Sequence, residues 1–290
     1  MNVIVAKNAG FCWGVKRAVT LSRDAARKKG GRIYTYGPLI HNRSVIKRLE
    51  AEGVHVLPEH ADAHAAGAAT LIIRAHGVPP GDTQRLVDAG YDVIDGTCPH
   101  VVKIQKEVAR AHKAGRTIVI VGDSDHAEVR GLLGFCGGKG IVVAGVDEIA
   151  AVPRDEPVTV VAQSTLDEET FAAVSHAVKN HCADAAIVDT RCNATAKTQR
   201  EAIALCAQVD AIVIVGGRDS ANTNRLAQLC REQGVRTFHV EEAGELRDSE
   251  FAGVATVGIT AGSSTPDWLI AEVAERLRAM PPARALNTEH

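Results

Sequence analysis

Three cysteines stand in matched local contexts, each directly before a segment with a helical pattern. The contexts are Gly-Phe-Cys-Trp at Cys12, Thr-Cys-Pro at Cys98 and Arg-Cys-Asn at Cys192. The unpaired N–H groups and the positive dipole end of a helix N-terminus favour the thiolate, which is the form that binds metal. The cysteines recur at similar, domain-sized intervals, which indicates three units that each contribute one thiol to a shared metal centre.

The kind of metal centre follows from the pattern of the remaining cysteines. No C-x-x-C pair is present, which disfavours a zinc ribbon. Three thiolates without a fourth suit a four-iron (4Fe-4S) cluster with one open iron, because complete ligation takes four protein ligands. An open iron can bind a substrate as a Lewis acid. The other cysteines fall inside or at the ends of helical patterns and are predicted to be structural: Cys136, Cys182, Cys206 and Cys230.

A second group of polar residues follows predicted strands. They are His41, His76, His126, Glu128, Ser164, Thr165, Ser220, Asn222 and Ser264. Ligands bind at the carboxyl ends of the strands in open α/β sheets, so we expect these side chains to face one cleft. Hydroxyls, amides and glycine-containing turns at helix starts suit phosphate oxygens, and histidine adds donors without a fixed charge. A diphosphate is the predicted ligand, with Glu128 as proton donor.

Each of these residues also has a simpler interpretation. Ser220 or Ser264 alone is typical of a helix N-cap, and a single histidine after a strand is typical of a satisfied structural side chain. Glu128 could equally be a solvated acid in the first turn of a helix. Only the shared placement favours a site. Neither GxGxxG nor GxxxxGK[ST] occurs, so nicotinamide, flavin and ATP are not indicated.

The elements that must position these residues alternate between strands and helices. Apolar, β-branched runs predict strands at 2–6, 32–36, 70–74, 117–121, 140–144, 158–162, 211–215 and 255–259. Three- and four-residue apolar spacing predicts helices at 15–28, 102–114, 196–208 and 222–233. This alternation indicates an α/β fold of three similar small units with parallel sheets. The proposed boundaries are 14–98, 99–189 and 190–280 with 1–13, followed by a frayed tail at 281–290.

The composition excludes several classes of protein. Of the 290 residues, 46% are hydrophobic, 23% are charged and only 3% are aromatic, with a formal net charge of -2. Few aromatic residues and no basic excess argue against a nucleic-acid partner. The N-terminus lacks a signal-peptide pattern and no window reaches membrane-spanning length, so we expect a cytoplasmic protein without membrane contact.

The motifs together resemble the IspH/LytB family of 4-hydroxy-3-methylbut-2-enyl diphosphate reductases. They are GFCWGVKRAV, YGPLIHN, AHGV, TCPHV, DHAEV, TRCNAT, SANTNRL and TAGSSTPDWLI, which span nearly the whole chain. The resemblance implies a trefoil of three lobes around a central 4Fe-4S cluster, with Cys12, Cys98 and Cys192 as ligands and the open iron meeting the substrate hydroxyl. It also implies Glu128 in proton delivery and a hydroxyl from Ser164 or Thr165 near the substrate alcohol. The diphosphate ligands that it implies are His41, His76, His126, Ser220, Asn222 and Ser264.

The implied reaction is a reductive dehydroxylation that gives isopentenyl and dimethylallyl diphosphate, the last step of the methylerythritol phosphate route to isoprenoids. A ferredoxin or flavodoxin is the expected electron donor, because the sequence contains no second redox motif. The alternatives are a non-redox iron–sulfur dehydratase and an iron–sulfur sensor. Polar residues after so many strands, and the lack of a basic helix-turn-helix region, argue against the sensor.

Overall fold

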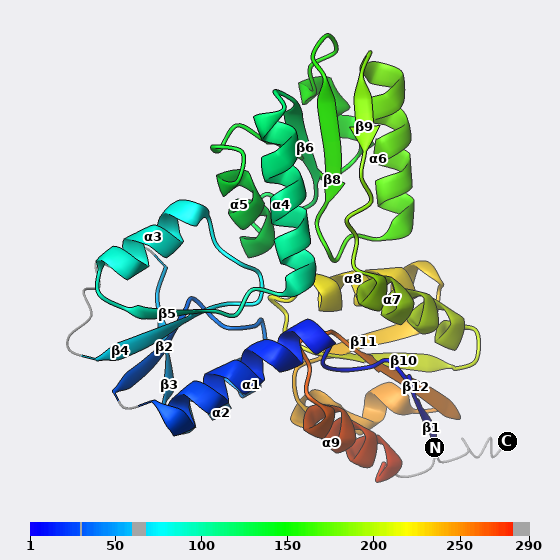
Figure 1. Ribbon diagram of the computed structural model, residues 1–290. Helices are drawn as coiled ribbons and strands as arrows, with labels where there is room; N and C mark the ends of the chain where they lie inside the picture. The colour runs from blue at the N-terminus through cyan, green and yellow to red at the C-terminus, as the bar shows by residue number, and fades with distance from the viewer. Residues whose placement is uncertain (30, 60–67, 281–290) are drawn as a thin grey trace, which may run out of the picture. The chain divides into compact units, whose positions relative to one another are not determined.

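The chain folds into two compact units in the computed structural model, which describes residues 1–29, 31–59 and 68–280 (Figure 1). The larger compact unit comprises residues 13–40 and 44–192. The smaller compact unit comprises residues 1–12, 41–43 and the chain from residue 193 onward. Two four-stranded parallel sheets belong to the larger unit and a third belongs to the smaller one.

The first sheet has the strand order β3-β2-β4-β5. Its strands are β2 (Arg32–Tyr36), β3 (Val54–Leu57), β4 (Ala69–Ile73) and β5 (Asp92–Asp95), and the helices are α1 (Trp13–Lys28), α2 (Arg43–Ala51) and α3 (Pro80–Asp88). Helix α1 packs on β2 and β3. It buries Val15, Ala18, Val19 and Ser22 at three- and four-residue spacing, the pattern from which the helix was predicted.

The second sheet has the order β7-β6-β8-β9. Its elements are α4 (Pro99–Lys113), β6 (Thr117–Val121), α5 (Ala127–Gly134), β7 (Ile141–Val143), η1 (Val146–Ala151), β8 (Val158–Ala162), α6 (Glu168–His181) and β9 (Ala185–Ile187). Successive side chains of β6 point to opposite faces. Val119 and Val121 therefore join the core beneath α6, whereas Ile118 and Ile120 join the core beneath α4 and α5. Burial on both faces explains the continuous apolar run.

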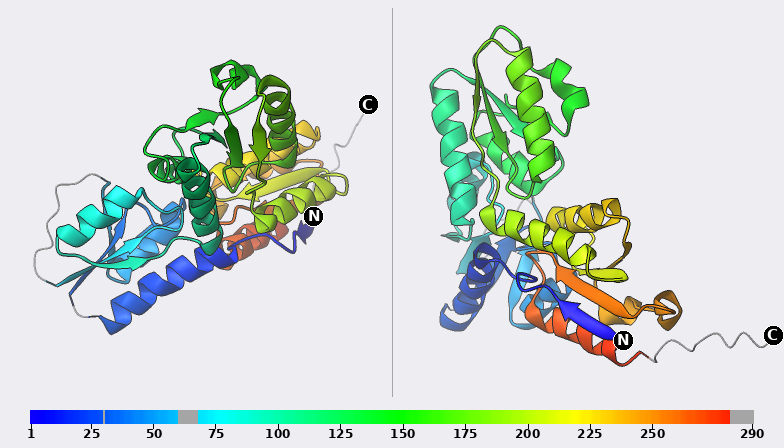
Figure 2. Two further views of the ribbon diagram at one scale, coloured as in Figure 1. Left: turned by 45° about the horizontal axis from the view of Figure 1, so that its top comes forward. Right: turned by 90° about the vertical axis from the view of Figure 1, so that its right-hand side faces the viewer.

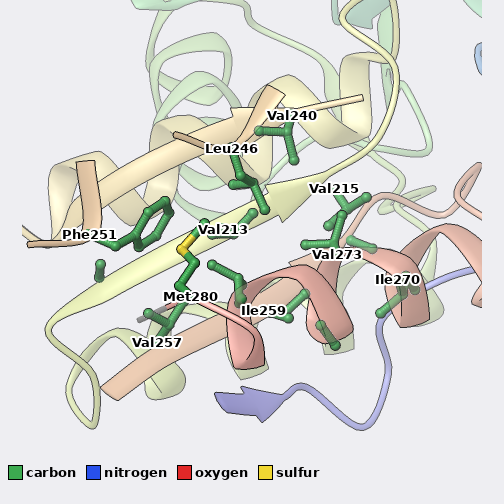
Figure 3. Close-up of a cluster of buried hydrophobic side chains, with 14 of the residues drawn as sticks. Val213, Val215, Val240, Leu246, Phe251, Val257, Ile259, Ile270, Val273 and Met280 are labelled. Atoms are coloured by element: carbon green, nitrogen blue, oxygen red, sulfur yellow. The ribbon is translucent and has the colours of Figure 1, made fainter. Parts of the chain in front are cut away.

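The third sheet has the order β1-β12-β10-β11. Its elements are β1 (Asn2–Val5), α7 (Asn193–Cys206), β10 (Ala211–Val215), α8 (Ala221–Glu232), β11 (Arg236–Val240), η2 (Ala243–Glu245), η3 (Asp248–Phe251), β12 (Thr256–Ala261) and α9 (Asp267–Arg278). Figure 3 shows one face, where Val213 and Ile259 pack against Val273 of α9. Strand β1 lies beside β12, with Asn2 opposite Thr256 (Figure 2). The N-terminal strand thus completes the C-terminal sheet.

All three sheets share one plan. In each, the chain passes from one inner strand to an outer strand and then crosses to the second inner strand. The opposite edge is filled by the next strand of the chain in the first two sheets, β5 and β9, and by the N-terminal strand β1 in the third. The direction of winding therefore reverses between the two inner strands, which are β2 and β4, β6 and β8, and β10 and β12. Such a reversal leaves a crevice at the carboxyl ends of these strands, where α/β proteins bind ligands.

These observations confirm the predicted α/β class with three similar parallel-sheet units. Every strand and helix range expected from the sequence overlaps an observed element, while β3, β5, β9 and β11 were not predicted. The proposed domain boundaries stay a prediction, and the expected frayed tail at 281–290 lies outside the described residues. None of the helices in the described ranges has the length and hydropathy that a membrane crossing requires.

Gly96 allows a close backbone approach directly before the Cys98 turn. A Cβ atom built on Gly96 would lie 2.2 Å from the backbone oxygen of Ile73. We expect Gly96→Ala to lower the free energy of unfolding by about 1–3 kcal/mol, because the turn must shift to relieve the overlap. Chemical denaturation measures this loss. Gly81→Ala is the matched control, since among the described residues no atom outside its chain neighbours and its own helix backbone lies within 4 Å of the added methyl. Equal stabilities for the two variants would contradict the prediction.

Candidate active site

The three cysteines of the matched contexts occupy equivalent places in the fold. Each is the residue directly before a helix, Cys12 before α1, Cys98 before α4 and Cys192 before α7. Each backbone N–H donates to a carbonyl two residues beyond an inner strand. The bonds are Cys98 to Ala75 at 2.9 Å, Cys192 to Ser164 at 2.8 Å and Cys12 to Ser263 at 3.2 Å. The prediction of a cysteine at each helix start is confirmed.

The thiol chemistry separates these three cysteines from the other four. All seven lie among the described residues and are free thiols, with Cys12, Cys98 and Cys192 partly exposed and the rest buried. Burial raises the pKa of the remaining thiols above the ordinary cysteine value, which keeps them protonated: Cys136, Cys182, Cys206 and Cys230. Partly exposed thiols at helix N-termini are the donor set that suits an iron–sulfur cluster, so the residues fit the implied group.

Two of the cysteine turns are tied together within the larger compact unit. His100, in the first turn of α4, places Nε2 2.8 Å from the backbone oxygen of Thr190, two residues before Cys192. Arg17 of α1 donates from Nη1 to the oxygen of Thr97 at 3.1 Å. Both contacts hold backbone next to a cysteine, so they orient the turns that carry Cys98 and Cys192. Sequence reasoning missed His100 and Arg17, because neither follows a strand and their partners are distant in the chain.

Glu128 is the buried acid of the larger compact unit. It lies in the first turn of α5, is only 2% exposed, and accepts two hydrogen bonds from Ser164: backbone N to Oε1 and Oγ to Oε2, both at 2.6 Å. Burial raises the pKa of Glu128, and the bonds from Ser164 partly oppose this rise. A solvated first-turn acid is therefore ruled out. Glu128 can retain a proton and pass it to the Ser164 hydroxyl.

The neighbouring hydroxyl of Thr165 has a different partner. Its Oγ1 accepts from Nε2 of Gln163 at 3.0 Å, and Oε1 of the same Gln163 accepts from the backbone N–H of Asp123 at 3.0 Å. Gln163 therefore holds the turn after β8 against the turn after β6. The sequence left open whether Ser164 or Thr165 acts near the substrate, and the structure bonds the Ser164 hydroxyl to Glu128.

His76 and His126 lie together in the larger compact unit. Their rings meet edge to face, with centroids 5.3 Å apart and planes at 90°. His126 is the N-cap of α5, and its Nδ1 accepts from the backbone N–H of Glu128 at 3.2 Å. An accepting Nδ1 carries no proton in the neutral ring, so Nε2 is the donor. His126 thus combines the N-cap role with a donor that suits a phosphate oxygen.

The smaller compact unit gathers the serines with the backbone of His41. Ser264 Oγ lies 3.3 Å from Ser220 Oγ and 3.3 Å from the backbone oxygen of His41. Ser220 is the N-cap of α8, as its simpler interpretation predicted. Asn222 in the first turn is 3% exposed, yet its Nδ2 and Oδ1 have no hydrogen-bond partner among the described residues. This buried amide is therefore available to hydrogen-bond a ligand or a bound water.

The structure therefore forms two groups from the predicted site residues. One group lies in the larger compact unit and consists of His76, His126, Glu128, Ser164, Thr165, Cys98 and Cys192. The other lies in the smaller compact unit and consists of Cys12, His41, Ser220, Asn222 and Ser264. Gln163, His100 and Arg17 are positioning residues that the sequence analysis did not single out.

Comparison with known proteins identifies relatives over almost the full chain. The protein named 4-hydroxy-3-methylbut-2-enyl diphosphate reductase from Geotalea uraniireducens (strain Rf4) is 44% identical over 277 residues, 96% of this chain and 97% of the relative. Its namesake from Aquifex aeolicus (strain VF5) is 40% identical over 281 residues, 96% of each chain. The predicted resemblance is thus confirmed at high coverage.

A solved structure of similar sequence leads to the same family, and a more distant one shows the same fold. One described as (E)-4-hydroxy-3-methyl-but-2-enyl diphosphate reductase, the terminal enzyme of the non-mevalonate pathway, shares 40% identity at a TM-score of 0.69, covering 96% of this chain and 99% of that one. A reductase structure from Plasmodium falciparum, 24% identical at a TM-score of 0.90 and covering 97% and 89%, supports the fold. The family model described as LytB protein matches residues 3–278. The chain therefore belongs to the LytB protein family.

Proposed function

We propose that the protein reduces 4-hydroxy-3-methylbut-2-enyl diphosphate to isopentenyl diphosphate and dimethylallyl diphosphate, the last step of the methylerythritol phosphate route. Two electrons and two protons replace the C–O bond of the substrate alcohol with a C–H bond and release water. The near-full-length match to reductases of this name supports the activity. One observation carries the chemistry, namely the buried Glu128 held on both carboxyl oxygens by Ser164.

Glu128 and Ser164 would move the proton that the leaving hydroxyl needs. Burial raises the pKa of Glu128 and so favours the protonated carboxyl, the form that a general acid needs. A hydroxyl both accepts and donates, so Ser164 Oγ can take the proton from Oε2 and give its own to the substrate oxygen. The pair acts as a short relay. Its rigidity comes from the second bond, between the Ser164 backbone N–H and Oε1.

Members of the LytB family are iron–sulfur enzymes, and Cys12, Cys98 and Cys192 would hold the cluster through their thiolates. The partly exposed thiols at three helix starts support this assignment. When bound, a four-iron cluster with three cysteine ligands would pass electrons from the external donor to the substrate and, at its open iron, supply a Lewis acid. His100 and Arg17 hold the backbone of the two cysteine turns in the larger unit.

The diphosphate would be bound by neutral donors at strand ends and helix starts. Asn222 offers an amide that is buried without a protein partner, and Ser220 and Ser264 offer hydroxyls at the start of α8 and after β12. The positive end of the α8 dipole favours an anion there. His126 donates from Nε2, and His76 and His41 complete the proposed set.

Electrons would come from a ferredoxin or flavodoxin, since the chain contains no second redox motif. A cytoplasmic location is part of the proposal, because seven cysteines without a disulfide are typical of a compartment that keeps thiols reduced. Neither assignment is needed for the reaction to be tested in vitro.

An anaerobic assay tests the proposed function. Purified protein is mixed with a reduced viologen dye, and dye oxidation is followed with and without 4-hydroxy-3-methylbut-2-enyl diphosphate, with iron and sulfide measured on the same sample. We expect substrate-dependent oxidation and five-carbon diphosphate products. A protein with its full cluster that leaves the dye reduced would contradict the reductase function and favour a dehydratase or sensor.

Ser164→Ala tests the proposed proton relay while the Glu128 carboxyl stays in place. The substitution removes the hydroxyl bonded to Oε2 of Glu128 but keeps the backbone bond to Oε1. We expect kcat to fall by about 10- to 100-fold, because proton transfer by a positioned group typically contributes at least this much. Thr165→Ala should give a smaller loss, and Ser164→Thr should retain activity. Steady-state assays measure all three, and a larger loss in Thr165→Ala would assign the relay to Thr165 instead.

A further inference from the structure

Glu59 lies between two arginines in the larger compact unit, and neither the predicted site nor the proposed mechanism uses them. Both Nη atoms of Arg74 bond the Glu59 carboxylate, with Nη2 at 3.2 Å from Oε2. Nη2 of Arg130 lies 3.8 Å from the same Oε2. The side chain of Arg74 is only 4% exposed, whereas that of Arg130 is 48% exposed. Glu59 is therefore the counterion of a buried cation.

Arg74 begins the turn that carries His76. The backbone N–H of Gly77 donates to the oxygen of Arg74 at 3.0 Å, and Arg74 Nε lies 3.5 Å from the oxygen of Gly77. The guanidinium thus braces both ends of the turn. Gly37 makes room for the ion pair, because a Cβ there would lie 2.8 Å from Arg74 Nη1 and 3.0 Å from Glu59 Oε1. The position of His76 depends on where Glu59 holds Arg74.

Arg130 holds the turn that carries His126. Its Nη1 donates to the backbone oxygen of Asp125, and its backbone N–H donates to the oxygen of His126 at 3.0 Å. Helix α5 also packs on the turn that carries His76, since a Cβ added to Gly131 of α5 would lie 3.7 Å from the backbone oxygen of His76. The two histidine turns therefore contact each other directly and share Glu59 through their arginines.

We propose that Glu59 is a positioning residue for the diphosphate site, because it sets the relative placement of His76 and His126 through Arg74 and Arg130. This inference rests on the proposed function. A carboxylate that two cations share fixes both guanidinium groups at once, and each guanidinium holds one histidine turn. Without it, the buried Arg74 loses its counterion and must move toward water, taking the His76 turn with it.

Glu59→Gln keeps the shape of the side chain and removes its charge. We expect the dissociation constant of inorganic diphosphate, measured by anaerobic calorimetry on the cluster-loaded enzyme, to rise about tenfold, as expected for the loss of one well-placed hydrogen bond to a charged group. The KM of the substrate should rise by a similar factor while kcat stays within about twofold, since the diphosphate is bound equally in the ground and transition states. Arg130→Gln, which leaves the buried pair intact, should give a smaller rise in both constants.

Glu52→Gln is the matched control, because Glu52 is also held by an arginine in the same unit, with Arg23 Nε at 2.7 Å and Nη2 at 3.0 Å. Its binding and kinetics should equal those of the wild type. A Glu59→Gln enzyme with a lower melting temperature but unchanged dissociation constant and KM would make the role structural and overturn the inference. If Glu59→Gln does not fold, Arg130→Gln becomes the test. An Arg130→Gln enzyme that binds inorganic diphosphate as tightly as the wild type does would then overturn the inference. Failure of the wild type itself to bind diphosphate would instead refute the proposed diphosphate site, and the inference with it.

Discussion

Replacing Cys98 with alanine is expected to remove the cluster and to lower turnover by about three orders of magnitude or more, as happens when a member of a catalytic unit is lost. Cys98 is one of the three partly exposed thiols at helix starts, and no other described cysteine is placed to substitute for it. Iron and sulfide analysis, with the visible absorption of the anaerobically reconstituted protein, measures the cluster directly. Activity is measured on the same sample.

Cys182→Ala provides the same chemical change at a structural cysteine. Cys182 is 7% exposed, and its Sγ donates to the backbone oxygen of Pro153 at 3.3 Å. Its loss should cost about 1 kcal/mol of stability and leave iron and turnover unchanged. A Cys98→Ala protein that bound its full iron, or a Cys182→Ala protein that lost it, would show that cysteines were assigned to the wrong class.

Glu128→Gln should lower kcat by about 10²- to 10⁴-fold while the cluster stays intact, because general acid catalysis contributes that much. The amide has the shape of the acid and can still accept the Ser164 backbone bond, but it has no proton to give. Anaerobic turnover and iron content are the measurements. Glu148→Gln is the control, since Glu148 also accepts a backbone N–H, from Ala144 at 2.8 Å, but is exposed. Unchanged turnover in Glu128→Gln would remove its assigned role.

Glu128→Gln is also expected to change how the free energy of unfolding depends on pH. Burial raises the pKa of Glu128 in the folded protein, so the folded chain binds this proton more tightly than the unfolded chain does. Its contribution to stability is full below the ordinary carboxyl pKa and is lost as pH rises through the raised pKa. Glutamine has no such proton. Denaturation at several pH values should therefore show Glu128→Gln gaining stability relative to the wild type as pH rises through this window, and a constant difference would contradict the raised pKa.

The inner strands could be predicted from the sequence because both of their faces are buried. Strand β6 has the sequence Thr-Ile-Val-Ile-Val, and such a continuous apolar run is typical of a strand that is buried on both faces. The strands that escaped prediction, β3, β5, β9 and β11, all lie at sheet edges. Strand β5 begins and ends with exposed aspartates, and β11 begins with the exposed Arg236. Edge strands are half solvated, so their sequences resemble loops and their pairing depends on the neighbouring strand.

The candidate site was predictable to the extent that it follows strands and helix starts. The three cysteines could be chosen from their matched local contexts, whereas Glu128 became a candidate only through its placement beside other polar residues that follow strands. Their partners could not, because the bond from Ser164 to Glu128 and the contact of His100 with Thr190 join segments brought together only by sheet order. For the same reason the sequence could not decide which of Ser164 and Thr165 supplies the hydroxyl near the substrate. The two residues have the same local pattern, and they differ in their hydrogen-bond partners, Glu128 for Ser164 and Gln163 for Thr165. Local pattern identifies candidate groups, and tertiary structure decides what each one contacts.

The pairing of β1 with β12 has a consequence for the order of events during synthesis. Asn2 leaves the ribosome long before its partner Thr256. The strand that leads to Cys12 therefore has no sheet to join until β12 has been made, whereas the strands around Cys98 and Cys192 can pair earlier. Of the three helix-start cysteines, Cys12 is thus the one whose supporting strand pairs last.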